Sequence, residues 1–225
     1  MIDMQLNKAL QLSLIEESLA AIGFAILESK ADAAQGRYWF CAPTGGDGTK
    51  TFLRFVRKPG FKILTAHVGW QNPFVRQFVI DSMKRSWPAG LHWMSENKLI
   101  EEPCLLTFNF GDQPSWPLSG IPFNCSEQEF AGHTRELRDL LQKLIVPIST
   151  ADVLLERYLA DVKPLRWLGG NTAIRFAEAA GLVKLVGKNA DELKRCAQKY
   201  APLIETHMFG LGSGSDWTKA LLEQL

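Results

Sequence analysis

The residues best suited to catalysis or metal binding are four cysteines and four histidines, and they are scattered along the chain. They are Cys41, Cys104, Cys125, Cys196, His67, His92, His133 and His207. No two of them have the three- or four-residue separation that lets ligands on one helix face share a metal ion, and no His-Glu-x-x-His motif occurs. We therefore predict no metal site and no cofactor, and spacing alone identifies no catalytic residue.

An enzyme whose site is assembled from distant residues remains an alternative. A thiolate activated by an imidazole is a nucleophile, and the two groups need only meet in space, as His67 could with Cys41 or Cys104. Two glycine-rich segments do not match known phosphate sites. Residues 44–50 (TGGDGTK) lack the Gly-Lys-Ser/Thr ending of a phosphate-binding loop. Residues 210–214 follow a predicted helix and have no βαβ unit after them.

A second group of polar residues lies on predicted strands. The segments 37–42, 51–57, 61–68 and 104–110 are rich in aromatic and β-branched residues and are separated by turn or helix signals. Successive side chains of a strand point to opposite faces of the sheet. One face is therefore apolar, and the other is predicted to carry a set of polar side chains, namely Arg54, Thr65, His67, Thr107 and Asn109.

We predict that this polar face binds a partner protein. Aromatic and arginine side chains dominate the binding energy of protein interfaces, and Trp39 and Arg57 border the face. Trp116 adds an aromatic contact from the loop 111–125, which is rich in proline and glycine but also apolar. An ordinary solvated sheet face and a loop packed over the core are the alternative interpretations.

The composition is that of a globular protein. The chain has 225 residues, 46% of them hydrophobic and 22% charged, which suffices for a buried core. No uncharged apolar run is long enough to span a bilayer, and the start Met1-Ile2-Asp3 lacks the basic residues of a signal peptide. The cysteines do not form a disulfide pattern. We therefore expect a cytoplasmic protein with no membrane partner.

The charges are segregated along the chain. The net charge is only +1, but residues 50–94 hold eight basic residues and one acidic residue, and residues 95–139 hold three basic and eight acidic ones. The two blocks could pair with each other, or the basic block could attract an acidic partner. A nucleic-acid-binding module that uses residues 50–94 is a further alternative, which the nearly neutral total charge disfavours.

The predicted elements give an α+β fold. A helix over 6–27 precedes a small, mostly antiparallel four-stranded sheet with helices packed on one face. From Ser126, which with Glu129 forms a capping box, the pattern becomes helical. We expect a sheet portion over 1–125 and a helical portion over 126–225, packed as one compact unit.

This order of elements resembles that of bacterial immunity proteins, which are encoded beside secreted polymorphic or type VI toxins. The resemblance includes the leading helix, the small sheet, the proline- and tryptophan-rich loop and a helical tail with Pro164-Leu165-Arg166-Trp167 and a helix over 171–186. It implies a cytoplasmic, non-enzymatic inhibitor that binds and neutralises a cognate toxin. It assigns no role to any single residue.

Overall fold

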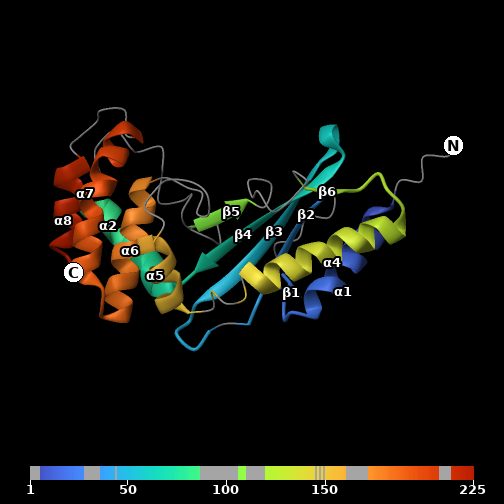
Figure 1. Cartoon of the computed structure of the whole chain (residues 1–225), viewed down its shortest axis with the longest axis horizontal. Coiled ribbons are helices and arrows are strands. Elements are labelled where there is room, and N and C mark those ends of the chain that lie inside the picture. The colour runs from blue at the N-terminus through green and yellow to red at the C-terminus, as the bar shows by residue number, and fades with distance from the viewer. Residues whose placement is uncertain are drawn as a thin grey trace. The chain divides into compact units, whose positions relative to one another are not determined.

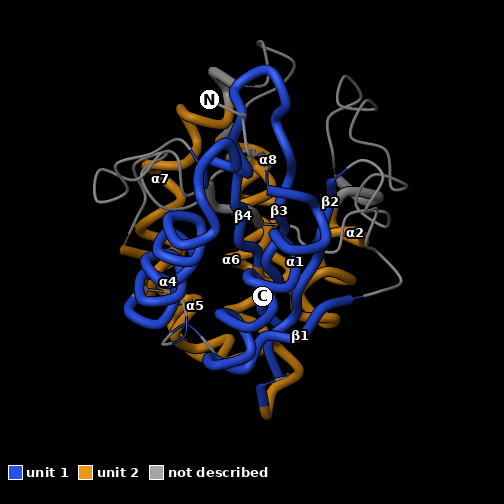
Figure 2. The backbone as a smooth tube through the Cα atoms, turned by 90° about the vertical axis from the view of Figure 1, so that its right-hand side faces the viewer, with its two compact units in different colours: residues 1–45, 50–69, 108–149 blue, residues 46–49, 70–107, 150–225 orange. Residues whose placement is uncertain are grey.

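The computed structural model shows an α+β protein whose C-terminal half is helical (Figure 1). The structure describes residues 6–27, 36–43, 45–86, 106–109, 120–144, 146, 148, 150–160, 172–207 and 214–225. The chain forms two compact units, coloured separately in Figure 2. Unit 1 comprises Met1–Gly45, Lys50–Gly69 and Phe108–Ser149, and unit 2 comprises Gly46–Thr49, Trp70–Thr107 and Thr150–Leu225.

These units do not follow the predicted portions 1–125 and 126–225. The helix α4 (Glu127–Leu144) belongs to unit 1, and the helix α2 (Pro73–Ser86) belongs to unit 2. The reason is that each unit gathers helices from both halves of the sequence. α4 packs on the N-terminal helix, and α2 packs on the C-terminal helix α6 (Thr172–Val186).

The sheet has six strands among the described residues, two more than expected. They are β1 (Ala25–Ile26), β2 (Arg37–Cys41), β3 (Lys50–Lys58), β4 (Ile63–Gln71), β5 (Leu106–Asn109) and β6 (Ile121–Pro122). The order is β1-β2-β3-β4-β5, and β6 also pairs with β4. The pairings β1–β2, β2–β3 and β4–β6 are antiparallel. The two additional strands, β1 and β6, have two residues each, too few to produce an alternating pattern in the sequence.

One face of the sheet is buried. In the antiparallel register Tyr38 lies opposite Phe55 and Phe40 opposite Leu53, so these four side chains share a face. All of them are buried, as are three alternating residues of β4, namely Leu64, Ala66 and Val68. The alternation predicted for the third strand is therefore confirmed.

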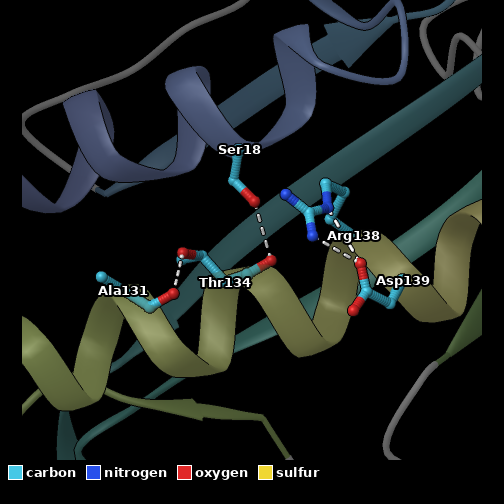
Figure 3. A network of polar contacts seen from close by, with 5 residues as sticks. All are labelled: Ser18, Ala131, Thr134, Arg138 and Asp139. Atoms are coloured by element: carbon cyan, nitrogen blue, oxygen red, sulfur yellow. Dashed lines mark hydrogen bonds and ion pairs between the residues drawn. The ribbon is translucent and has the colours of Figure 1, made fainter.

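The helices α1 (Lys8–Ala20) and α4 lie side by side in unit 1 (Figure 1). The Ser18 hydroxyl of α1 donates a hydrogen bond of 2.9 Å to the carbonyl oxygen of Thr134 on α4, and the Thr134 hydroxyl donates to Ala131 (Figure 3). Helix α1 ends well before residue 27. Gly23, with a φ of +84°, closes it, and the N–H of Phe24 returns to the carbonyl of Leu19.

Helix α6 lies at the centre of unit 2. Every residue from 173 to 183 is buried, and α6 packs on four helices: α2, α5 (Ala151–Ala160), α7 (Ala190–His207) and α8 (Gly214–Leu222). Helix α7 continues through Pro202, although proline removes one helical hydrogen bond, because Tyr200, Ala201 and Ile204 are buried on either side of it. No helix in the described part of the chain is long and apolar enough to cross a bilayer.

Two helix starts are capped by nearby side chains, and the one at Ser126 confirms the predicted capping box. Asn72 caps α2, since its side-chain oxygen accepts from the N–H groups of Phe74 at 3.0 Å and Val75 at 3.3 Å, and Pro73 is the first helical residue. Ser126 and Glu129 form the capping box of α4. The Glu129 carboxylate accepts from the Ser126 N–H at 2.8 Å, and the Ser126 hydroxyl accepts from the Glu129 N–H at 3.3 Å.

Candidate protein interface

The second face of the sheet carries three of the predicted polar side chains, Arg54, Thr65 and His67. Trp39 lies opposite Arg54 in the β2–β3 register, and both alternate with buried residues. On β4, Thr65 and His67 alternate with Leu64, Ala66 and Val68, so they also point away from the buried face. All four side chains are half-buried. We call Trp39, Arg54, Thr65 and His67 the polar face.

Arg54 stacks on Trp39, with its guanidinium carbon 5.3 Å from the ring centroid. No hydrogen bond or ion pair with another described residue holds this guanidinium, and its Nε atom is buried without an acceptor. A buried donor without an acceptor costs about 1–3 kcal/mol. The indole therefore orients the arginine, and its N–H groups meet no acceptor among the described residues.

Thr65 and His67 form a short polar chain on β4. The Thr65 hydroxyl donates to the carbonyl oxygen of Val56 at 3.1 Å, and His67 Nε2 lies 3.3 Å from the same hydroxyl oxygen. This contact joins two side chains that lie two positions apart on β4, and it orients the His67 ring toward Thr65.

Arg57 lies on the opposite, buried face and contacts the helical layer. Its guanidinium donates to the Gln11 side chain of α1 at 2.7 Å and stacks on Phe123, 3.6 Å from the ring centroid. The strand alternation explains this. Arg57 is two positions after Phe55 and four after Leu53, so all three side chains point to the same face of the sheet. The structure therefore does not bring Arg57 together with Arg54, although the sequence analysis grouped them.

The remaining predicted contacts are described only in part. Thr107 and Asn109 lie on β5, which neighbours β4 in the sheet. Trp116 lies outside the described residues, and so does Cys104.

The described part of the chain gives no thiol–imidazole pair for His67. The Cys41 thiol donates to the carbonyl oxygen of Ala42 at 3.1 Å. Burial raises the pKa of Cys41 above its ordinary value of 9.0, more than the nearby Lys50 lowers it, so the thiol stays protonated near neutral pH. Within the same residues, no group of three or more His, Cys, Asp or Glu could hold a metal ion.

The β3–β4 hairpin, residues 50–69, carries five basic residues and no acidic one. None of the five forms an ion pair with a described residue. The carboxylates of α4 interact locally instead. Asp139 accepts from Arg138 at 2.7 Å (Figure 3), and Glu136 lies 3.4 Å from His133. Among the described residues, the five cations of the hairpin are therefore not paired with the carboxylates of α4.

Unit 2 contains a buried polar cluster that the sequence analysis did not single out. Tyr158 of α5 donates to the carboxyl group of Glu178 on α6, next to Arg175 one turn earlier. Burial raises the pKa of Glu178 to about 8, and the bond from Tyr158 and the charge of Arg175 offset only part of that rise. The available signal was the presence of Arg175 and Glu178 within the otherwise apolar run 173–183.

The same unit has an open groove of about 440 Å³ beside α2, α6 and the chain's last turn. Several of the polar groups that line it bind one another. Gln77 donates to Asp81 at 3.0 Å, and the Lys184 ammonium donates to the Gln224 carbonyl at 2.7 Å.

Comparisons with known proteins provide no relative. No family model matches the chain, and neither the curated proteins nor the solved structures contain a match. The function has to be argued from the residues of this chain.

Proposed function

We propose that the protein is a non-enzymatic inhibitor that binds another protein through the polar face. In this proposal it acts in the cytoplasm as an immunity protein and neutralises a cognate bacterial toxin by occlusion. The supporting observation is the arginine on the polar face. Arg54 is oriented by Trp39, and its N–H groups have no acceptor among the described residues.

The chemistry of this arginine defines the group that it would bind. A guanidinium presents parallel N–H donors that match the two oxygens of a carboxylate, and arginine and tryptophan are the residues most enriched at binding hot spots. The partner would supply an Asp or Glu side chain to Arg54 and a polar group to Thr65 or His67. The excess of positive charge in the β3–β4 hairpin would attract such an acidic surface and speed the encounter.

The product of the reading frame beside this protein's gene is the partner to test. Isothermal titration calorimetry of the two purified proteins should show binding, and co-expression should relieve the toxicity of that product. Arg54→Ala should weaken binding by about 2 kcal/mol or more, as expected for a hot spot. Arg54→Lys keeps the positive charge but cannot form the bidentate hydrogen bonds of a guanidinium with a carboxylate, so this variant should also bind less tightly.

A matched control is Arg157→Ala, which removes an exposed arginine from unit 2. This variant should bind like the native chain. Equal binding by the native chain and Arg54→Ala would show that the polar face is not the interface. Turnover of a small molecule by the purified protein, without any protein partner, would contradict the whole proposal.

A further inference from the structure

The tip of the β3–β4 hairpin exposes an aromatic side chain. The short 3-10 turn η2 (Pro59–Phe61) joins the two strands and stands out from the sheet (Figure 1). Phe61 is 80% exposed, which makes it the most exposed large hydrophobic residue among those described. Placing a phenylalanine in water forgoes about 1.5–3 kcal/mol of burial energy, so such a residue suggests a contact made with another molecule.

The backbone holds this tip in one conformation. Pro59 fixes one φ angle, and the Lys62 N–H donates to the Pro59 carbonyl at 3.1 Å. Lys62 itself has a left-handed conformation, with φ 53° and ψ 37°, which is strained for a residue with a side chain. Its carbonyl accepts from the Phe123 N–H at 3.1 Å, so the turn is tied to the segment after β6. A contact residue on a rigid turn loses little entropy on binding.

The charged residues beside Phe61 are both lysines. Lys58 and Lys62 are exposed on either side of η2, and neither forms an ion pair with a described residue. The two arginines of the hairpin stack on aromatic rings, Arg54 on Trp39 and Arg57 on Phe123. The tip therefore combines one exposed apolar side chain with two cations that no described carboxylate pairs with.

We infer that the hairpin tip is a second contact point with the partner protein, where Phe61 enters an apolar pocket bordered by carboxylates that pair with Lys58 and Lys62. The inference rests on the proposed function and adds the chemistry of the partner's surface. It also places a main hot spot away from the polar face, at Phe61, which the sequence analysis took as the first residue of the strand 61–68 and which lies in the turn η2.

The number of free cations favours a protein over a nucleic acid or a membrane. Affinity for nucleic acid comes mainly from Lys and Arg contacts to phosphates, about 6–10 of them in a strongly salt-dependent complex, and the tip offers two lysines. Each lysine near an anionic bilayer contributes about 1 kcal/mol, and even a whole myristoyl chain anchors only marginally. By contrast, a single buried aromatic surrounded by a polar rim is the usual form of a protein hot spot.

The test is calorimetric titration of the product of the neighbouring reading frame with three purified proteins: the native chain, Phe61→Ala and a control. Phe61→Ala should weaken binding at least ~30-fold, which corresponds to a hot spot. The control is Phe74→Ala, which removes the exposed phenylalanine of α2 in unit 2 and should leave binding unchanged. Because Phe61 is so exposed, its variant should keep the thermal unfolding midpoint of the native chain.

A second variant tests the charges. The double substitution Lys58→Ala, Lys62→Ala should reduce the loss of affinity that the native chain shows between about 50 and 200 mM salt. An unchanged salt dependence would overturn the role given to the two lysines.

The outcomes separate this inference from the proposed function. Binding by the native chain with equal binding by Phe61→Ala overturns the tip contact and leaves the proposed function standing. No binding by the native chain overturns both. Binding of a single-stranded oligothymidine of about 20 nucleotides, or of phosphatidylcholine vesicles with about one third phosphatidylserine, that is lost in Phe61→Ala would overturn the choice of a protein partner.

Discussion

The Asp47 carboxylate accepts a hydrogen bond from the backbone N–H of Ala151, a residue 104 positions later in the chain. Asp47 lies in the turn between β2 and β3, and Ala151 begins α5, so a side chain distant in sequence supplies one of the acceptors that a helix start lacks. The same carboxylate accepts from the Thr49 N–H at 2.9 Å, and the Asp47 carbonyl accepts from the Asn72 side chain at 3.0 Å. One short turn in unit 2 thus fixes the starts of α5 and α2.

Asp47→Ala should lower the free energy of unfolding by about 1 kcal/mol, the usual cost of losing a helix cap. Burial alone raises the pKa of Asp47, but the N–H groups of Ala151 and Thr49 outweigh it and hold the pKa below 3.8. The carboxylate therefore contributes stability that is present above pH 3.8 and is lost as the pH falls through the folded-state value.

Urea unfolding at neutral pH and in acid measures both effects. Asp191→Asn is the control, since Asp191 is 93% exposed at the start of α7 and should change stability by less than about 0.5 kcal/mol. A native-like unfolding curve for Asp47→Ala at neutral pH would show that the bond to Ala151 is not stabilising.

For Glu178 we expect a dependence of stability on pH that is opposite in sign to that of Asp47. The pKa of Glu178 is about 8 in the folded state, against an ordinary value of 4.5. Between these pH values the folded chain keeps a proton that the unfolded chain has released, so stability falls as the pH rises, by at most about 1.4 kcal/mol per unit. Glu178→Gln has no such proton to lose and should become more stable than the native chain towards pH 8.

Denaturation of the two proteins across this pH range is the measurement. The control, Glu156→Gln, removes an exposed carboxylate of α5 and should follow the native pH dependence. Infrared spectroscopy gives a second readout, because a protonated Glu178 should show a carboxylic C=O band at neutral pH that Glu178→Gln lacks. Parallel curves for the native chain and Glu178→Gln would mean that the buried group is ionised.

Local patterns predicted the parts of this fold that depend on neighbouring residues. The caps at Asn72-Pro73 and Ser126–Glu129 were recoverable because their donors and acceptors are two or three positions apart. The polar face was recoverable from alternation along β4. Two-residue strands such as β1 carry no such pattern, since they exist only through pairing with a longer strand.

The sequence was least informative where distant residues decide the environment of a side chain. Arg57 was predicted to contact a partner, which stays a prediction, and its position on the strand with Leu53 and Phe55 and its bond to Gln11 are what the structure adds. The cluster of Tyr158 and Glu178 joins two helices, so spacing within either helix could not reveal it. The predicted partner itself remains a proposal.

Arg57 and Arg54 should therefore respond differently to truncation. Arg57→Ala removes the bond to Gln11 and the stacking on Phe123, and we expect a loss of about 1–3 kcal/mol in the free energy of unfolding. Arg54→Ala leaves behind no hydrogen-bond partner among the described residues and should change stability by less than about 0.5 kcal/mol. Chemical denaturation of both variants checks the difference. Equal stability of the two would contradict the division of the two arginines between opposite faces of the sheet.

Gly120 and Gly132 form a matched pair for testing the packing of unit 1. A Cβ atom on Gly120 would lie 2.5 Å from the carbonyl oxygen of Leu64, in the backbone of the β4 strand with which β6 pairs. Because backbone cannot move aside as a flexible side chain does, Gly120→Ala should destabilise the protein by about 2 kcal/mol or more.

A Cβ on Gly132, inside α4, would meet nothing within 4 Å. Gly132→Ala should therefore stabilise the protein by about 0.5–1 kcal/mol through helix propensity. Thermal unfolding of the two variants should shift the midpoint in opposite directions, and a shift in the same direction would contradict the close approach of residue 120 to β4.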